Sequence, residues 1–332
     1  MDKKKIFQSI LFFIIGLGIL WYVFRDTDLQ ELKSELYRVH WFWVVVSIVL
    51  NLLSQLVRAY RWKTLFIPLK YNPKVYNLFL SILILAFTNQ VIPRGGEVAR
   101  LGVVNKYEKV PFSKLFGIAL IERLTDFIIL ILIFIILLIW QFPLIKKIVA
   151  LPQINMEDFS ILRIVWIAAA IFAGLAVLFL VVRKFNLLKN FKSKIQKAKK
   201  ELKEGFTSIY HIKNKPLYAM QSVLIYAIWL VMLYVLFFAY PPTEHLSFKA
   251  AAFTFGLATL AFLLPIQAGM GAWHFVVIQC LLLFGVETGV GKVFALIAHS
   301  ATNHIYLITG TIAFALLPVV NGQRKSRQKS DN

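Results

Sequence analysis

Residues 89–97, NQVIPRGGE, interrupt an apolar stretch that extends from residue 76 to residue 104. A second apolar stretch, 248–286, is interrupted in the same way by residues 265–271, PIQAGMG. Proline breaks a helix because it lacks a backbone N–H group, and glycine weakens one. At membrane depth the freed backbone groups are tolerated only where protein or water shields them. Both stretches therefore predict a broken helical hairpin rather than a plain membrane span.

The composition of the chain explains why lipid is the expected solvent. Of its 332 residues, 59% are hydrophobic and 15% are aromatic, which is more than a water-soluble core needs. Further apolar runs are each close to the roughly 20 residues that a membrane-spanning helix requires. The sequence predicts an all-α polytopic membrane protein with about six full transmembrane helices, at residues 6–24, 41–57, 117–140, 161–182, 217–240 and 293–318.

Charge in the connecting segments predicts how these helices are oriented. Residues 58–75 hold five basic and no acidic residues, and residues 183–216 hold eleven basic and two acidic ones. Segments 241–249 and 287–292 are each balanced. Basic connections stay on the cytoplasmic side of a membrane. The charges obey this rule when both broken stretches are re-entrant hairpins and both chain termini are cytoplasmic.

This arrangement predicts two membrane repeats of opposite topology. The first repeat is residues 1–150 with the broken hairpin 76–104, and the second is residues 161–320 with the broken hairpin 248–286. Inverted repeats with broken segments at matching positions are typical of transporters whose binding site lies where the broken pieces meet. The alternative is that both stretches span as kinked helices, which gives eight or more crossings.

Basic residues also predict contacts at the inner membrane surface. In residues 183–216, apolar side chains recur at helical spacing among lysines, which predicts a cytoplasmic amphipathic helix against anionic inner-leaflet lipids. A solvated linker and a scaffold that recruits partners are the alternatives. Residues 321–332 form a basic cytoplasmic tail. The net charge of +21 does not indicate nucleic-acid binding, because the basic residues lie in connections rather than on a soluble domain.

Ionisable side chains cluster around the first break, where burial in lipid would make them costly. The cluster comprises two sets at helical spacing, Arg94, Glu97 and Arg100, then Glu122, Arg123 and Asp126. A guanidinium suits phosphate, and a helix beginning at residues 95–96 offers free backbone N–H groups to the same anion. Together with Asn89, the cluster predicts a site for a phosphate headgroup. The alternative is an ion-pair staple, in which glutamates neutralise arginines so that the hairpin packs.

Polar residues also flank the second break. The candidate binding residues there are Gln267, Gly269, Gly271 and His274. His274, His299 and His304 are candidates for a proton relay, because histidine titrates near neutrality. Buried neutral histidines are the alternative. No metal site is expected, since no carboxylate lies near these histidines in the sequence.

Three motifs carry a resemblance to a known family: PRGGEVAR at 93–100, ERLTD at 122–126 and PIQAGMG at 265–271. In this order, and over nearly the whole chain, they resemble the flippase-like family related to the transmembrane region of lysylphosphatidylglycerol synthase. The resemblance implies movement of lipids or lipid-linked headgroups between leaflets, a role for the charged residues of the first two motifs, and a bacterial plasma (inner) membrane location. His274 departs from the family pattern, since many relatives have glutamate there.

We therefore expect a lipid translocator, not an enzyme, with no cofactor. Its expected partner is a membrane lipid whose phosphate headgroup is held by Arg94, Arg100 and Arg123. Lysylphosphatidylglycerol synthases carry a large soluble aminoacyl-transfer domain after the membrane region, whereas this chain ends at Asn332 in a short basic tail, so aminoacyl transfer is not expected. The rival is a membrane-embedded enzyme or accessory subunit acting on a lipid-linked donor, which would change the headgroup.

Overall fold

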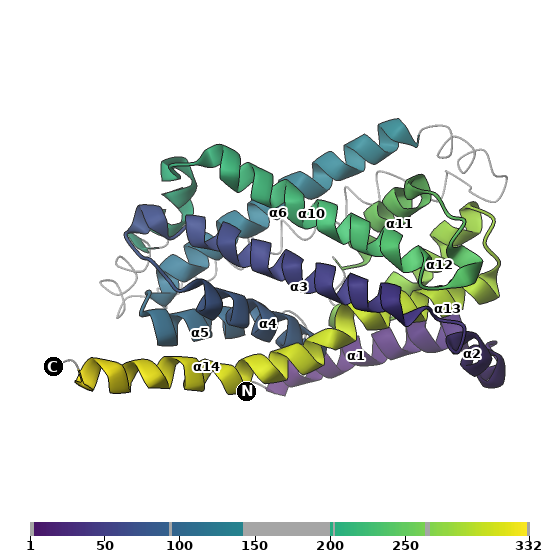
Figure 1. Cartoon of the computed structure of the whole chain (residues 1–332), viewed down its shortest axis with the longest axis horizontal. Helices are drawn as coiled ribbons and strands as arrows, with labels where there is room; N and C mark the ends of the chain where they lie inside the picture. The colour runs from purple at the N-terminus through teal and green to yellow at the C-terminus, as the bar shows by residue number, and fades with distance from the viewer. Residues whose placement is uncertain (1–2, 93–94, 142–199, 202, 263–265, 331–332) are drawn as a thin grey trace, which may run out of the picture.

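The computed structural model describes residues 3–92, 95–141, 200–201, 203–262 and 266–330 (Figure 1). Within these ranges every regular element is helical. The α-helices are α1 (Lys3–Phe24), α2 (Leu29–Leu36), α3 (Trp41–Thr64), α4 (Val75–Val91), α5 (Gly96–Glu108), α6 (Phe112–Trp140), α10 (Lys215–Phe237), α11 (Phe248–Ala261), α12 (Ala272–Leu283), α13 (Thr288–His299) and α14 (Ile305–Ser330). Short 3₁₀ turns are η1 (Ile67–Leu69), η3 (Ser208–His211), η4 (Pro241–Thr243) and η5 (Gln267–Gly269), and η6 (Ser300–His304) is a π-helix.

Three of the described helical segments are long and apolar enough to cross a membrane: Trp41–Leu69, Lys215–Phe237 and Thr288–Gly322. They coincide with the predicted spans at 41–57, 217–240 and 293–318. Figure 1 shows α3, α10 and α14 running along the long axis of the molecule. α6 contains 29 residues, or about 43 Å of helix at 1.5 Å per residue. The predicted span 161–182 lies outside the described residues.

The boundary of α3 corrects the sequence analysis. The apolar run ends near residue 57, and residues 58–75 were predicted to be a basic connection, yet α3 continues to Thr64. In these last two turns Arg58 and Arg61 point into the protein and form ion pairs with carboxylates of α6. Arg58 and Arg61 are both buried.

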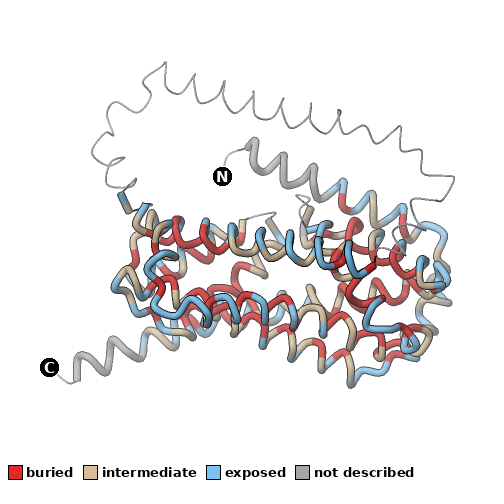
Figure 2. Tube along the Cα trace, turned by 90° about the horizontal axis from the view of Figure 1, so that it is seen from above, coloured by how far each residue is buried: buried red, intermediate tan, exposed pale blue. Residues whose placement is uncertain are grey.

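α3 has the reversed amphipathic pattern of a helix that faces lipid. Its polar side chains recur every three or four residues and are buried, namely Ser47, Asn51, Ser54, Gln55, Arg58 and Arg61. Large apolar side chains such as Val45, Val49 and Leu53 are exposed instead. A water-soluble helix would show the opposite arrangement. Figure 2 shows buried and exposed positions alternating along the helices of the bundle. The interior of the molecule is therefore unusually polar, and the polar groups there need partners.

Both broken stretches form a helix, a break and a second helix that packs against the first. α4 packs against α5, and α11 packs against α12. The first hairpin closes at Gly96, where an added Cβ would lie 2.7 Å from the side-chain oxygen of Asn89. In the second break, Ala268, Gly269 and Gly271 all have positive φ angles. Gly271 also lies against the backbone of α1, where an added Cβ would lie 2.8 Å from the carbonyl oxygen of Gly16.

The two hairpins meet inside the bundle. η5, in the second break, contacts α4 of the first hairpin, and it also contacts α1. The Gln90 side chain at the end of α4 donates to the carbonyl oxygen of Asn303 in η6 at 3.3 Å. Gly310 of α14 lies directly against Phe87 of α4, where an added Cβ would lie 2.9 Å from Cγ of the ring. The last helix thus links the first hairpin to the second half of the chain.

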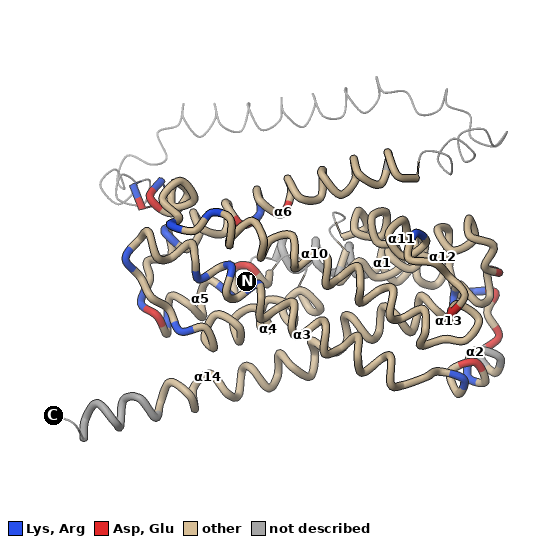
Figure 3. The backbone as a smooth tube through the Cα atoms, turned by 45° about the horizontal axis from the view of Figure 1, so that its top comes forward, with Lys and Arg blue, Asp and Glu red and all other residues tan. Residues whose placement is uncertain are grey.

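Polar contacts join the connecting segments at each end of the bundle. At one end, Asn77 of α4 binds both Glu108 of α5, at 2.6 Å, and Asn321 of α14. At the same end, Lys114 forms an ion pair with Glu204 at 2.9 Å. At the other end, the Tyr240 hydroxyl donates to Glu35 of α2 at 2.7 Å. Figure 3 shows charged residues at both ends and, between them, a group near α5 and α6.

The predicted amphipathic linker is described only in its second part. Residues 183–199 lie outside the described residues, whereas residues 203–207 are helical and lead into η3. Ile212 is buried in the cluster of apolar residues formed by α3, α4, α5 and α6, and Ile209 packs against it. The end of this linker therefore rests on the first half of the chain.

Candidate functional site

Seven charged side chains from three helices form one ion-pair cluster, which we call the arginine–carboxylate cluster. α3 supplies two arginines, α5 supplies one arginine and one glutamate, and α6 supplies the rest. The members are Arg58, Arg61, Arg100, Arg123, Glu97, Glu122 and Asp126. Within the described residues this cluster holds four guanidinium groups and three carboxylates, so it has an excess of one positive charge at neutral pH.

Glu122 lies at the centre of the cluster and is fully buried. Its Oε1 accepts from Arg58 Nε at 2.8 Å and lies 3.4 Å from Arg61 Nη2. Its Oε2 lies 2.7 Å from Arg100 Nη1. A carboxylate enclosed in protein is stable only when it is well paired, and three guanidinium groups provide that pairing here. Glu122 therefore joins α3, α5 and α6 at one point.

Arg100 is enclosed rather than open to a ligand. Its side chain has 0% exposure. The guanidinium bridges Glu97 and Glu122, at 2.7 Å in each case, and its Cζ lies 4.2 Å from the centroid of the Trp62 ring. Stacking on an aromatic ring adds a favourable cation–π interaction to the ion pairs. This is the geometry that the ion-pair staple predicts. Arg100 pairs with two carboxylates of the cluster and does not line the neighbouring cavity.

Arg123 has a different environment, because 47% of its side chain is exposed. It forms a short ion pair with Glu97 at 2.7 Å and longer ones with Asp126 at 3.5 Å and Glu122 at 3.6 Å. Asp126 is held more firmly by Arg61, at 2.8 Å. Among the described arginines of the cluster, Arg123 is the one that can most easily exchange a carboxylate for another anion.

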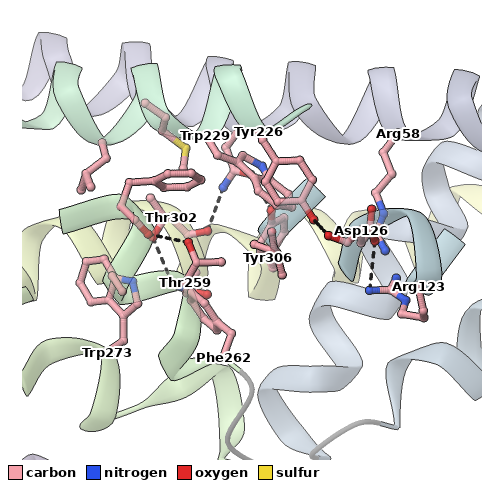
Figure 4. A pocket seen from close by; sticks show the side chains of 17 residues that line it. Arg58, Arg123, Asp126, Tyr226, Trp229, Thr259, Phe262, Trp273, Thr302 and Tyr306 are labelled. Carbon is pink, nitrogen blue, oxygen red and sulfur yellow. Dashed lines mark hydrogen bonds and ion pairs between the residues drawn. The ribbon is translucent and has the colours of Figure 1, made fainter. Parts of the chain in front are cut away.

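A cavity of about 370 Å³ lies beside the cluster (Figure 4). Charged residues line one part of it, and the remainder is lined by aromatic, hydroxyl and amide side chains together with the apolar residues Leu130, Met232, Leu233 and Ala258. The charged lining residues are Arg58, Arg123 and Asp126. The polar and aromatic ones are Asn51, Thr259, Thr302, Asn303, Tyr226, Trp229, Phe255, Phe262, Trp273 and Tyr306. Figure 4 shows Arg58, Arg123 and Asp126 together on one side and Trp273, Thr259 and Thr302 on the other.

A hydrogen-bonded network continues from the cluster along α3. The Tyr306 hydroxyl donates to Asn51 Oδ1 at 2.5 Å and accepts from Gln55 Nε2 at 2.7 Å. The Trp229 indole donates to Ser54 at 2.8 Å. Asn51 Nδ2 donates to the backbone carbonyl of Thr302 at 2.8 Å. The network provides partners for Asn51, Ser54 and Gln55 on the buried polar face of α3, and it links that face to the wall of the cavity.

The π-helix η6 explains why Asn51 can reach the backbone carbonyl of Thr302. A π-turn interrupts the regular α-helical hydrogen bonding, and such turns occur often at functional sites. Here it leaves the carbonyl of Thr302 for Asn51 and the carbonyl of Asn303 for Gln90. Side chains of both residues line the cavity.

The second break brings the predicted histidines together. His299 interacts through Nε2 with the carbonyl of Ala268 at 3.0 Å. Its ring centroid lies 4.4 Å from that of His274 and 5.8 Å from that of His304. His274 and His299 are buried, and His304 is exposed. Trp273 is adjacent and lines the cavity, which the histidines do not. The three rings lie next to one another in the order His274, His299, His304. The proton relay remains a prediction.

The structure separates the remaining predicted residues. Asn89 accepts from the backbone N–H of Gly96 at 2.9 Å, so it caps the start of α5 and occupies a group that was expected to be free for an anion. Gly269 and Gly271 shape the second break through their positive φ angles. Arg94 and the side chain of Gln267 lie outside the described residues.

Sequence analysis missed several residues of this site. Arg58 and Arg61 were assigned to a connection, and the aromatic residues Tyr226, Trp229 and Tyr306 were not distinguished from lipid-facing ones. One signal was present in the sequence. Polar residues recur at helical spacing from Ser47 to Arg61, through an otherwise apolar run. That pattern marks the protein-facing side of a membrane helix.

Comparison with known proteins places this arrangement in a family. The model of the lysylphosphatidylglycerol synthase transmembrane region matches residues 9–310, which include both hairpins and the whole cluster. The chain belongs to this family. The protein is an integral membrane protein, as the family and its apolar helices establish.

One curated relative of this chain is the UPF0104 membrane protein MJ1595 of Methanocaldococcus jannaschii. It is 27% identical over 129 residues, which cover 38% of this chain and 38% of the relative. The match thus spans less than half of the relative's length. No solved structure matches the chain.

Proposed function

We propose that this protein moves a phospholipid or lipid-linked headgroup between membrane leaflets, with the anionic headgroup in the cavity beside the arginine–carboxylate cluster. One observation carries the proposal: among the described residues, the arginines of the cluster outnumber its carboxylates by one beside a cavity of about 370 Å³, inside a membrane protein. An uncompensated positive charge at this depth is costly unless an anion can join it. The relation to the lysylphosphatidylglycerol synthase transmembrane region supports a lipid as the source of that anion.

The contacts suggest which arginines meet the headgroup. Arg123 and Arg58 line the cavity, whereas Arg100 is enclosed behind it. A phosphate that binds Arg123 would take the place of a carboxylate oxygen, since guanidinium presents the same fork of donors to both. We therefore place the headgroup against Arg123 and Arg58, with Arg94 as a further candidate. Arg100 holds Glu97 and Glu122 in position.

The hairpins fit the transport topology expected from the sequence. α4, α5, α11 and α12 contain 17, 13, 14 and 12 residues, so each is shorter than the roughly 20 residues needed to span. We propose that α4–α5 and α11–α12 are re-entrant hairpins from opposite sides, within inverted repeats. The proposal includes cytoplasmic termini, with the membrane a bacterial plasma membrane. Lys70 and Lys74 lie in the predicted basic connection 58–75, and the exposed Lys106 and Lys109 follow the first hairpin, which supports this orientation.

The cycle contains no chemical change to the headgroup. When the phosphate displaces a carboxylate from Arg123, Glu97 or Asp126 loses one of its ion-pair partners. Lipid movement is either downhill or driven by ions or protons, with Glu97, Glu122, Asp126 and His274 as the candidate residues for coupling. An enzyme acting on the same lipid would release a modified headgroup.

The decisive experiment uses purified protein in liposomes that contain a trace of phospholipid with a fluorophore on one acyl chain. An impermeant reductant bleaches the outer leaflet, and bleaching beyond half of the signal reports movement from the inner leaflet. We expect wild-type protein to raise the bleached fraction, Arg123→Ala to abolish the increase, and Arg123→Lys to retain part of it. Lys106→Ala, a change at an exposed residue of α5, is the control.

Two results would overturn the proposal. One is an Arg123→Ala variant that moves lipid as fast as wild type at equal protein content. The other is a changed mass of the labelled lipid after the assay, which would show that the protein is an enzyme.

A further inference from the structure

The cavity beside the cluster is divided into a charged part and an uncharged part, and this division bears on the chemistry of the headgroup. The formal charges among its described lining residues are those of Arg58, Arg123 and Asp126, which gather on one side (Figure 4). The other side presents Trp273, Thr259 and Thr302. A ligand that fills the whole cavity therefore has an anionic end and an uncharged polar end.

The uncharged part has unused hydrogen-bonding capacity. The Trp273 indole N–H donates to no described residue, and the side-chain oxygen of Asn303 accepts from none, although its amide nitrogen donates to His299 O and Thr302 Oγ1. The Thr259 hydroxyl donates to the Phe255 carbonyl at 2.6 Å and keeps its lone pairs available. A hydroxyl group both donates and accepts, so it can satisfy all three kinds of group.

The aromatic lining of the cavity suits the carbon-bound hydrogens of such a hydroxyl-bearing ligand. Trp229, Trp273, Tyr226, Tyr306 and Phe262 present ring surfaces around the cavity. Carbon-bound hydrogens of a polyhydroxyl compound pack against such surfaces while its hydroxyl groups reach polar neighbours, and burial without these partners would be costly. An aliphatic acyl chain would leave the Trp273 indole N–H and the side-chain oxygen of Asn303 without partners among the described residues. A cationic headgroup would lack a free carboxylate, because Asp126 is already bound by Arg61 at 2.8 Å.

The geometry points to a phosphate esterified to a small neutral polyol, glycerol or a sugar, as the ligand class. This inference rests on the proposed function, since it names the headgroup of the same site. The phosphate lies against Arg58 and Arg123, and the polyol lies between Trp273 and Asn303. A volume of about 370 Å³ is near the lower end of the roughly 300–1,000 Å³ typical of ligand pockets, which suits a headgroup without its acyl chains.

The first test is a binding measurement that does not depend on transport. Glycerol 3-phosphate and glucose 1-phosphate are titrated calorimetrically into the purified protein, beside methyl phosphate, inorganic phosphate, phosphocholine and phosphoethanolamine. We expect the two polyol phosphates to bind at least about tenfold more tightly than methyl phosphate, because their hydroxyl groups add hydrogen bonds in the uncharged part of the cavity.

Two substitutions in the uncharged part locate the preference. Trp273→Phe removes the indole N–H, and Asn303→Leu removes the amide, each at similar size. Each is expected to weaken polyol phosphate binding about fivefold and to leave methyl phosphate unchanged. Trp41→Phe, the same change at an exposed tryptophan outside the cavity lining, is the matched control. Tightest binding of phosphocholine or phosphoethanolamine, or equal binding of methyl phosphate, would overturn the inference.

The second test separates a lipid from a soluble source of the same chemistry. Liposomes with the protein receive either acyl-labelled phosphatidylglycerol or radiolabelled glycerol 3-phosphate. Movement of the lipid, with the binding preference, supports both the inference and the proposed function. Uptake of the soluble phosphate without lipid movement supports the polyol phosphate site and refutes lipid translocation. Lipid movement without any polyol preference refutes the inference alone.

Discussion

Arg58 of α3 donates to Glu122 of α6 across 2.8 Å, and both side chains are buried. The two residues are 64 positions apart in the chain. Their contact attaches the end of α3 to the helix that follows the first hairpin, so the cluster is part of what holds the membrane bundle together as well as a candidate binding site.

Replacing Glu122 with glutamine should therefore destabilise the protein strongly. Arg58 and Arg100 would keep their buried charges without a carboxylate between them, and breaking a buried ion pair in this way costs about 3–5 kcal/mol. Unfolding in mixed detergent micelles, followed by circular dichroism, measures the difference. Glu287→Gln changes an exposed glutamate and should alter the stability by less than about 0.5 kcal/mol. Equal stability of wild type and Glu122→Gln would show that the cluster does not hold the helices.

The close approach of α4 and α5 predicts opposite effects for two glycines of the same helix. A Cβ at Gly96 would lie 2.7 Å from the Asn89 side-chain oxygen that caps α5 and against the carbonyl oxygen of Leu85. Gly96→Ala should destabilise the protein by about 1–3 kcal/mol, as overpacking does. Gly102 has no neighbour within 4 Å, so Gly102→Ala should stabilise α5 by about 0.5–1 kcal/mol. The same detergent unfolding assay compares them, and a harmless Gly96→Ala would mean that the hairpin is not closed at this point.

Glu35 predicts a pH dependence at the opposite end of the bundle. The Tyr240 hydroxyl and Arg38 hold the pKa of Glu35, in the connection helix α2, below its ordinary value of 4.5. A carboxylate whose pKa is lower in the folded protein stabilises the fold at any pH above its pKa in the unfolded chain. This contribution is lost as the pH falls through its pKa in the folded protein. Wild type should therefore melt at a higher temperature than Glu35→Gln at neutral pH, and the difference should shrink as the pH falls below 4.5. A difference that grows in acid would contradict this.

The re-entrant hairpins predict which positions can be labelled from each side of the membrane. Single cysteines at Lys106, His245 and Thr288, all exposed, are introduced in a Cys280→Ala background. An impermeant maleimide should label position 106 only from the cytoplasmic side and positions 245 and 288 only from the outer side. Thr243 is unsuitable, since it is buried and bonds to the carbonyls of Phe237 and Tyr240. Labelling of 245 and 288 from opposite sides would mean that α11–α12 crosses the membrane completely.

The sequence predicted features that depend on local chemistry. Proline, glycine and neighbouring polar residues located both breaks, because these residues alter backbone conformation wherever they occur. The ion-pair staple, kept as the alternative to a phosphate site, matches the Glu97–Arg100 ion pair at 2.7 Å. The apolar runs predicted an all-helical membrane protein, and the family and the described helices confirm it. Full span count and re-entry stay predictions.

Features that depend on distant partners could not be predicted. Arg58 and Arg61 belong to a basic segment that reads as a connection until the carboxylates of α6 are known to lie beside it. Tyr306 and Trp229 resemble any lipid-facing aromatic residue, and only their bonds to Asn51 and Ser54 show that they face inward. The π-turn at Ser300–His304 contains no proline or glycine that would mark it in the sequence.

The ratio of arginines to carboxylates in the cluster has an electrical consequence. Among the described residues the empty site carries one net positive charge, whereas a bound monoanion brings it to zero. A membrane voltage of about 100 mV acts on one elementary charge with about 2.3 kcal/mol. Under the proposed cycle, voltage would draw the empty site toward the negative side and would leave the loaded step unaffected. Charge then moves across the membrane only when the empty site returns. A voltage that draws the empty site toward its starting side should speed this return, and the opposite voltage should slow it.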